Sequence, residues 1–138
     1  MPELIANIDV DDLARAEAFY TAALGLRLGR RFGADAVELV GASARLFLLA
    51  KPAGTAPYDG AASGRGYARH WTPVHLDFAV ADLAVALASA RAAGAVLERD
   101  VASYAFGRMA MLADPFGHGF CLIEFGPGGY DAGLAPEA

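Results

Sequence analysis

Ile8-Asp9-Val10-Asp11-Asp12-Leu13-Ala14 is followed, seventy residues further along the chain, by the similar segment Phe78-Ala79-Val80-Ala81-Asp82-Leu83-Ala84. At the same offset, the first copy ends in Ala22-Ala23-Leu24-Gly25 and the second in Ala92-Ala93-Gly94-Ala95. Similarity at a fixed period is the sequence signature of a repeated structural unit. The chain is therefore predicted to contain two related modules.

Each copy opens with a segment in which every second residue is apolar. This period of two predicts a β-strand with one wholly apolar face, which must pack against another part of the protein. The opposite face carries polar side chains. The apolar positions are Leu4, Ala6, Ile8 and Val10 in the first copy and Val74, Leu76, Phe78 and Val80 in the second, and they alternate with Ile5, Asn7 and Asp9 and with Pro73, His75, Asp77 and Ala79.

A helix is predicted after each of these strands. Asp12 and Asp82 are natural N-caps, because a carboxylate can accept the free amide hydrogens of the first helical turn. Gly25 and Gly94 are expected to end the helices, since glycine tolerates the left-handed conformation of a helix exit. Between these limits apolar residues recur at helical spacing, at Leu13, Ala16, Phe19, Tyr20 and Ala23 and at Leu83, Ala86, Leu87 and Ala90.

Three short strands are predicted after each helix, so the order strand, helix, strand, strand, strand occurs twice. We therefore expect an α+β fold of tandem βαβββ modules, at residues 1–50 and 73–125, within one structural domain. A linker or rim loop rich in glycine, alanine and proline spans residues 51–72, and the tail 126–138 is expected to be loop or frayed terminus. The six additional strands are predicted at residues 26–31, 36–40, 45–50, 96–101, 107–112 and 119–125.

The composition is that of a globular protein, with 138 residues of which 56% are hydrophobic and 20% charged. The formal net charge of −5 argues against nucleic acid as a partner. The chain begins with no signal peptide and has no apolar stretch of membrane-spanning length, so a cytoplasmic protein with no membrane partner is expected. The single cysteine, Cys121, fits a reducing compartment. The apolar excess leaves surface for a lined cavity or a homodimer interface.

The second copy carries the more specific motifs. Pro73-Val74-His75-Leu76-Asp77-Phe78-Ala79-Val80 is followed by Gly94-Ala95 and by Ala113-Asp114-Pro115-Phe116-Gly117-His118-Gly119-Phe120-Cys121-Leu122-Ile123. Pro115 presets a turn and Gly117 supplies its permissive backbone. With the repeat, these motifs resemble the vicinal oxygen chelate superfamily, which contains glyoxalases, bleomycin resistance proteins and extradiol dioxygenases. The resemblance implies that the modules form a cup-shaped mixed sheet, often completed across a homodimer.

The resemblance also implies four inward-facing metal positions, on the first and the last strand of each module. Carried over to this chain, three of them fall on Ile5, His75 and Cys121. The fourth lies on the strand 45–50, whose register the sequence leaves open, but residues 46–50 offer no carboxylate, imidazole or amide. One conventional ligand remains, and divalent ions need several such donors. No family-type metal and no other cofactor is therefore expected.

Polar residues on the same inward faces are candidates for a site. His75 could be a catalytic acid or base, or a hydrogen-bonded cavity residue. Cys121 beside it could form a reactive thiolate, or be a small buried residue. Asn7, Asp9 and Asp77 could bind polar groups of a ligand or lie solvated at the rim. Asp9 or Asp77 could also act as a substitute ligand in a rebuilt divalent-metal site.

Aromatic side chains are the remaining candidates for ligand binding. Trp71 ends a segment that mixes cations with aromatics, and its indole could stack on a planar ligand at the rim of the cup. The alternative is that this segment is a solvated loop. The predicted binding set is completed by Phe47 on the strand 45–50 and by Tyr104, Phe106 and Arg108 near the turn into the strand 107–112.

These features favour a protein that binds a small aromatic or amphipathic molecule in an apolar cup, without a family-type metal and as a homodimer. The alternative is a lyase or dioxygenase-type enzyme that uses a rebuilt metal site or His75 as acid and base. A third hypothesis is a dimeric scaffold or regulatory module with a vestigial cup, which side chains would fill. The fold alone does not decide among them, because function depends on the site.

Overall fold

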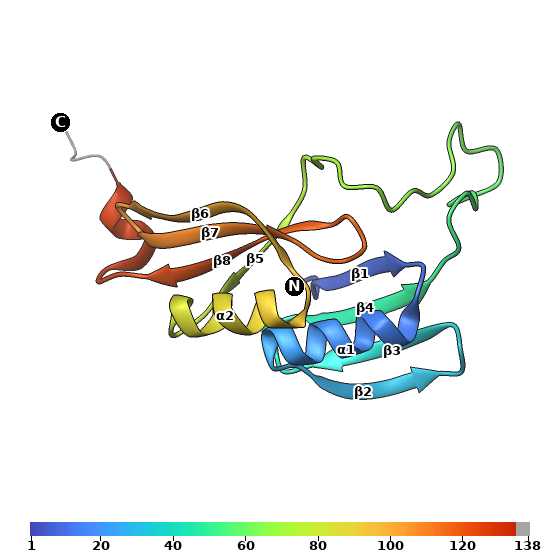
Figure 1. Ribbon diagram of the computed structural model, residues 1–138, viewed down its shortest axis with the longest axis horizontal. Helices are drawn as coiled ribbons and strands as arrows, with labels where there is room; N and C mark the ends of the chain where they lie inside the picture. Colours follow the sequence, from blue (N-terminus) through green and yellow to red (C-terminus); the bar gives the residue numbers. More distant parts are fainter. Residues whose placement is uncertain (135–138) are drawn as a thin grey trace.

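The computed structural model describes residues 1–134 and contains the βαβββ order twice (Figure 1). The first module consists of β1 (Ile5–Val10), α1 (Leu13–Leu24), β2 (Arg27–Phe32), β3 (Ala36–Val40) and β4 (Arg45–Ala50). The second consists of β5 (Leu76–Ala79), α2 (Leu83–Ala93), β6 (Val96–Tyr104), β7 (Gly107–Ala113) and β8 (Gly119–Phe125). The α+β fold of tandem modules is confirmed.

Each module builds one four-stranded mixed sheet, ordered β1-β4-β3-β2 in the first and β5-β8-β7-β6 in the second. The first and last strands of each module pair in parallel, and the other neighbours pair antiparallel. A parallel pair needs a long crossover, which the helix and the two intervening strands of each module supply. The two sheets remain separate, and β1 and β5 are edge strands of their sheets.

Both helices begin and end where the sequence predicts. The Asp12 carboxylate accepts a hydrogen bond from the Arg15 amide at 3.0 Å, and Asp82 accepts one from Val85 at 3.1 Å. Gly25 and Gly94 leave the helices in left-handed conformations, with φ of 67° and 117°. The matching caps give both modules the same path from strand into helix.

The helices α1 and α2 pack against one another and each covers one face of a sheet (Figure 1). The core is continuous across both modules because the apolar faces of the strands and helices meet there. Its fully buried members include Val10, Leu39, Leu48, Leu83, Leu112, Phe116 and Leu122. The opposite face of each sheet is not covered by a helix, and it carries the polar positions that alternate with the core residues.

Several element limits differ from the predicted ones. The strand β6 continues to Tyr104 because it pairs with β7 up to Gly107, through two register irregularities. The predicted loop after β8 contains a short 3-10 helix at Gly129–Gly133. The part of the tail at 135–138 lies outside the described residues. Residues 51–75, all of them described, form no helix or strand. No helix among the described residues has the length and apolarity needed to cross a bilayer.

Candidate ligand-binding site

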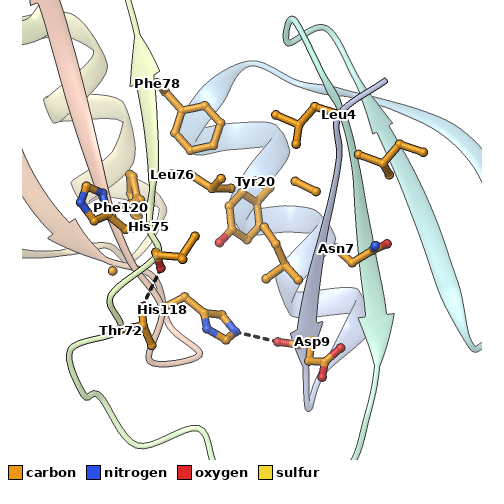
Figure 2. A pocket seen from close by; sticks show the side chains of 15 residues that line it. Leu4, Asn7, Asp9, Tyr20, Thr72, His75, Leu76, Phe78, His118 and Phe120 are labelled. Carbon is orange, nitrogen blue, oxygen red and sulfur yellow. Dashed lines mark hydrogen bonds between the residues drawn. The ribbon is translucent and has the colours of Figure 1, made fainter. Parts of the chain in front are cut away.

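A cavity of about 520 Å³ lies between the two modules (Figure 2). One wall is β1, the other is β5 with the start of β8, and Tyr20 of α1 lies at its base. Drug-sized ligands occupy pockets of roughly 300–1,000 Å³, so the volume is sufficient for one. The cavity is lined by Leu4, Ile5, Ala6, Asn7, Ile8, Asp9, Tyr20, Thr72, Val74, His75, Leu76, Phe78, His118, Gly119 and Phe120.

The lining combines apolar side chains with a few polar ones. Ile8, Leu76 and Phe78 come from the core-facing positions of β1 and β5, and the Phe120 ring lies edge-on to Phe78 at 6.1 Å. The polar members are Asn7, Asp9, Tyr20, Thr72, His75 and His118. A mainly apolar wall with few polar groups is typical of sites for small organic molecules.

Three of the predicted site residues, Asn7, Asp9 and His75, line this cavity. Trp71 is not among its lining residues, but its ring lies 5.4 Å from the His75 ring and is 58% exposed. The fluorescence of the Trp71 indole is therefore expected to respond to a ligand that binds beside His75. The Asp9 carboxylate already accepts a hydrogen bond from Arg65 Nε at 2.7 Å. Asp9 thus ties the linker to the end of β1.

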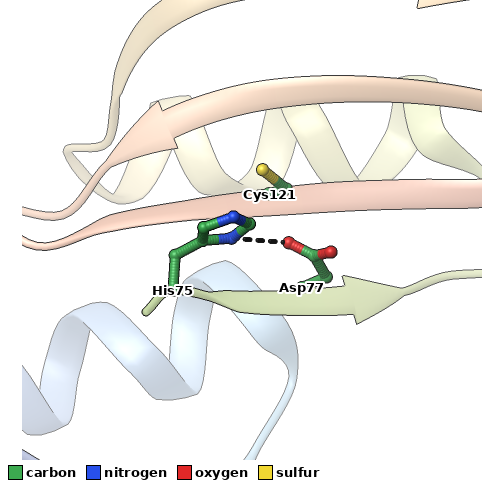
Figure 3. Close-up of side chains that lie close together, drawn as sticks. All are labelled: His75, Asp77 and Cys121. Atoms are coloured by element: carbon green, nitrogen blue, oxygen red, sulfur yellow. Dashed lines mark hydrogen bonds and ion pairs between the residues drawn. The ribbon is translucent and has the colours of Figure 1, made fainter. Parts of the chain in front are cut away.

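His75, Asp77 and Cys121 lie together on the uncovered face of the second sheet (Figure 3). Asp77 and Cys121 are direct partners in the parallel pair β5–β8, and His75 Nδ1 lies 3.0 Å from Asp77 Oδ1. Burial raises the pKa of the Cys121 thiol to about 12, and the neighbouring Asp77 carboxylate adds to this effect. The thiol is thus protonated near neutrality, which disfavours a reactive thiolate.

The strand register identifies the fourth metal position that the sequence leaves open. Asn7 pairs with Phe47 in β1–β4 as Asp77 pairs with Cys121 in β5–β8. Because Asn7 and Asp77 are equivalent in the repeat, Phe47 occupies the place of Cys121 in the first module. Neither Phe47 nor Ile5 has a donor atom for a metal, so the residues present do not fit the four-donor site that the family uses.

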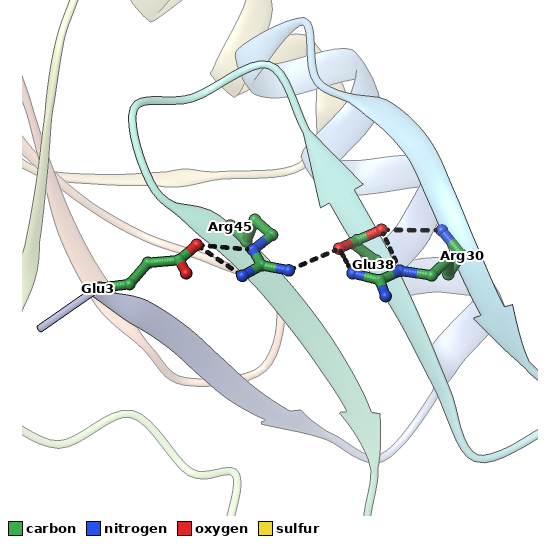
Figure 4. A network of polar contacts seen from close by, with 4 residues as sticks. All are labelled: Glu3, Arg30, Glu38 and Arg45. Atoms are coloured by element: carbon green, nitrogen blue, oxygen red, sulfur yellow. Dashed lines mark hydrogen bonds and ion pairs between the residues drawn. The ribbon is translucent and has the colours of Figure 1, made fainter.

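An ionic network lies on the uncovered face of the first sheet (Figure 4). Glu38 is only 4% exposed, and both of its carboxylate oxygens accept hydrogen bonds from Arg30, at 3.1 and 2.8 Å. Arg45 lies 4.0 Å away and also pairs with Glu3. The hydrogen bonds from Arg30 hold the pKa of Glu38 at about 2, below its ordinary value of 4.5. The network braces β2, β3 and β4, and none of its members lines the cavity.

A family model described as the glyoxalase-like domain matches residues 6–123. The chain belongs to this family. The matched segment runs from β1 to β8 and includes both modules. A search of curated protein sequences found no significant match.

Solved structures of glyoxalase-like proteins share the fold. A glyoxalase-related enzyme from Fulvimarina pelagi superimposes with a TM-score of 0.71 at 16% identity, over 90% of this chain and 88% of that one. TioX from Micromonospora sp. ML1 gives 0.67 at 18%, over 91% and 99% of the two chains. TnmS3, an antibiotic binding protein from Streptomyces sp. CB03234, gives 0.64 at 20%, over 91% and 97%. At these identities the similarity shows the fold alone.

Four further predicted site residues of this glyoxalase-like domain do not line the cavity: Phe47, Tyr104, Phe106 and Arg108. The Tyr104 and Phe106 rings stack at 5.2 Å in an aromatic cluster with Phe125 and Tyr130. This cluster lies at the far end of the second sheet. Arg108 pairs with Glu124, whose carboxylate also accepts a hydrogen bond from the first amide of α2. Phe47 faces Phe32 on the first sheet, with 6.2 Å between the rings.

Two polar cavity residues, Tyr20 and His118, were missed by the sequence reasoning. The Tyr20 hydroxyl donates to the buried Asp114 carboxylate, and burial together with that carboxylate raises the pKa of Tyr20 well above its usual value. His118 Nε2 lies 2.7 Å from the Asp9 carbonyl oxygen. Because a carbonyl only accepts, His118 Nε2 carries the proton. Tyr20 has the helical spacing of a core residue, and His118 directly follows the turn Asp114-Pro115-Phe116-Gly117, so neither was identified as a cavity residue.

Asp114 links the Tyr20 contact and the His118 contact to the turn before β8. Its Oδ1 accepts hydrogen bonds from the amides of Phe116 and His118 at 2.8 and 2.9 Å. The turn before β8 therefore holds Tyr20 of α1 on one side and presents His118 to β1 on the other. Gly117 has φ of 84°, and a Cβ there would lie 2.4 Å from the Tyr67 carbonyl oxygen. The linker thus packs directly on this turn.

Proposed function

We propose that the protein binds one small aromatic or amphipathic molecule in the cavity between its modules, without a family-type metal. The observation that carries this proposal is the cavity itself, whose walls are apolar strand faces and whose polar groups are few. Apolar burial provides affinity, whereas a small number of fixed polar groups orients a ligand. Its similarity in fold to TnmS3, described as an antibiotic binding protein, supports the same class of function.

The charges around the cavity favour an uncharged ligand. Among the described residues, no lysine or arginine lines the cavity, and the Asp9 carboxylate is engaged by Arg65. An anionic ligand would therefore lose its hydration without gaining a permanent cation. The other polar residues of β1, the linker and the segment before β5 that line the cavity are Asn7, Thr72 and His75. We infer a planar apolar body with one or two neutral polar groups.

A homodimer and a cytoplasmic location belong to the same proposal. Ile5 and Phe32 on the first sheet are 43% and 49% exposed, and Phe125 on the second is 40% exposed. Apolar side chains exposed on sheet faces favour association with a second copy. A single cysteine fits a reducing compartment. Native mass spectrometry showing twice the mass of the 14.3 kDa chain would support the dimer.

The binding test uses N-phenyl-1-naphthylamine, a neutral aromatic fluorophore. Because Trp71 is the only tryptophan and lies beside His75, a bound probe is expected to quench its emission saturably, with one probe per chain. Ala6→Phe places a ring in the cavity and is expected to abolish saturation. Ala18→Phe, on the exposed side of α1, is the matched control and should bind as the natural protein does. Equal binding by both variants would refute the site.

A second candidate function is suggested by the contact between His75 and Asp77. A carboxylate 3.0 Å from Nδ1 orients an imidazole as it would in a general acid or base. In that case a bound compound would be converted, and His75→Ala would abolish the turnover while the protein stayed folded. Recovery of unchanged ligand from the complex would instead support the binding protein.

A further inference from the structure

One wall of the cavity is the free edge of β1. All residues from Leu4 to Asp9 line the cavity without a gap. Side chains alternate between the two faces of a strand, so consecutive residues line one cavity only when the edge of the strand is directed at it. Among residues 1–134, β4 is the only strand paired with β1, and the opposite edge of β1 therefore presents its main-chain N–H and C=O groups to the cavity.

The pairing of β1 with β4 fixes which main-chain groups point into the cavity. The Val10 carbonyl oxygen accepts a hydrogen bond from the first amide after β4, at 2.9 Å. Because the main-chain groups of alternate residues point to the same edge, those of Ile5, Asn7 and Asp9 point away from β4. The Asp9 carbonyl oxygen agrees with this, since it accepts from His118 Nε2 at 2.7 Å on the other side (Figure 2).

Most of these groups have no partner within the protein. In the part of the chain that the structure describes, neither the main-chain groups of Ile5 and Asn7 nor the Asp9 amide form a hydrogen bond. Free N–H and C=O groups in a row, beside an apolar wall, are what an extended peptide recognises when it adds to a sheet edge. The available edge from Ile5 to Asp9 is about 13 Å long, which fits an extended segment of about four residues.

We propose that the ligand of this cavity is a peptide-like molecule whose secondary amides pair with the free edge of β1 as an added strand. This inference rests on the proposed function, and it extends the neutral polar groups of that ligand to a row of amides. Amides carry no charge, so they need no lysine or arginine from the cavity wall. Each amide also offers one donor and one acceptor, as the edge of β1 does.

The walls of the cavity also favour a pattern of side chains in the bound segment. The apolar side chains on the core side of the two walls are Ala6, Ile8, Leu76 and Phe78. The Ala6 side chain is small and leaves room for a large one, whereas the opposite face of β1 carries Asn7. Because side chains alternate along an extended segment, we expect large apolar residues, aromatic ones included, at every second position of the ligand.

The other two edge strands are poor sites for strand addition. Natural proteins protect exposed edges with charged side chains and bulges. There are three arginines among the six residues of β2, and β6 contains Glu98-Arg99-Asp100. Both strands pair through register irregularities, whereas β1 and β5 pair in a regular register and carry one charged residue each. The edge of β1 inside the cavity is therefore the one we expect a peptide to choose.

The test uses an acetylated and amidated tetrapeptide in which phenylalanine alternates with alanine. It is expected to bind the protein, with one peptide per chain, and to displace N-phenyl-1-naphthylamine. The matched control is the same peptide with a methyl group on every amide nitrogen between its residues, which keeps the apolar side chains and removes the donors. Since each lost hydrogen bond weakens binding severalfold, the methylated peptide should bind about tenfold more weakly or worse.

Hydrogen exchange followed by nuclear magnetic resonance locates the added strand. The tetrapeptide should slow exchange of the Asn7 and Asp9 amides, which point to the free edge. The Ile8 amide is the internal control, because it points to β4 and is already paired. Slowed exchange in β2 or β6, with Asn7 and Asp9 unchanged, would overturn the proposal.

The remaining outcomes separate this inference from the proposed function. Saturable binding of N-phenyl-1-naphthylamine that the tetrapeptide does not displace would overturn strand addition and leave the cavity as a site for other small molecules. Equal affinity for the tetrapeptide and its methylated form would show that the edge of β1 contributes no hydrogen bonds, and it would overturn the inference in the same way. Failure of both the fluorophore and the tetrapeptide to bind would refute the proposed function as well.

Discussion

Tyr20 shows how a single hydroxyl joins the two modules. It lies on α1 of the first module, and its partner Asp114 lies in the turn before β8 of the second. Asp114 is 3% exposed, so its carboxylate depends on hydrogen bonds for stability. Because burial raises the pKa of Tyr20, the hydroxyl remains a donor throughout the neutral range.

Tyr20→Phe is expected to lower the free energy of unfolding by about 1–3 kcal/mol, because it removes a donor from a buried carboxylate. Urea unfolding followed by circular dichroism measures the change. Tyr104→Phe removes a hydroxyl from a side chain that is 36% exposed, and it should have little effect. Equal losses in both variants would show that the contact with Asp114 contributes nothing specific.

Glu38 gives the stability a defined dependence on pH. Its pKa in the folded protein is about 2, below the ordinary 4.5, because Arg30 donates to it. The stabilisation is therefore complete above the unfolded value, and it is lost as the pH falls toward 2. The natural protein should be more stable than Glu38→Gln at pH 6, and the difference should shrink between about pH 4.5 and 2.

The control for that series is Glu3→Gln, whose parent carboxylate is 63% exposed and pairs with Arg45. An exposed ion pair contributes little, so this variant should follow the natural protein at every pH. A constant difference between Glu38→Gln and the natural protein across the titration would contradict the role assigned to Arg30.

At the scale of elements, the repeat was sufficient to predict both helices and the order of all strands. The caps Asp12 and Asp82 and the exits Gly25 and Gly94 are local signals, which is why they could be identified without the structure. Strand ends were less certain. The extension of β6 to Tyr104 depends on its pairing with β7, and pairing partners lie outside any local window.

Arg65 holds the linker, residues 51–72, in place. The Arg65 guanidinium donates hydrogen bonds to the Asp9 carboxylate at 2.7 Å and to the Ala56 carbonyl oxygen at 3.0 Å. Arg65→Ala should lower local stability by roughly 1 kcal/mol, which makes the linker open about fivefold more often. Limited digestion with a nonspecific protease should then cleave residues 52–66 faster.

Arg91→Ala, on the exposed side of α2, is the control for that digestion. Cleavage at the natural rate in Arg65→Ala would mean that the backbone bonds between Arg65 and residues 54 and 55 suffice to hold the linker.

At the scale of the whole molecule, the site depends on how two modules dock. Alternation along the strands correctly predicted which side chains share a face, and three of the residues chosen on that basis, Asn7, Asp9 and His75, line the cavity. It did not show that the cavity lies between β1 and β5, since those strands belong to two modules that are far apart in the sequence. Tyr20 and His118 line the cavity only through this docking, so no local pattern marked them as ligand contacts.

The register of β4 is a second property of the whole fold. Residues 45–50 are mostly apolar and alternate weakly, so their sequence does not specify the pairing. Only the pairing of β4 with β1 places Phe47 opposite Asn7, and this pairing identifies Phe47 as the fourth family metal position. Phe47 and the aromatic cluster around Tyr104 also show that aromatic residues in a strongly apolar sequence need not line the cavity.

The most direct test of the cavity is nuclear magnetic resonance of ¹⁵N-labelled protein titrated with N-phenyl-1-naphthylamine. The largest amide shifts should occur at Ile8, Leu76 and Phe120, in the two walls and beside Tyr20. The exposed aromatic cluster of Tyr104, Phe106, Phe125 and Tyr130 is the competing apolar surface. Shifts confined to that cluster, with the cavity walls unchanged, would contradict the proposal that this protein binds its ligand between the modules.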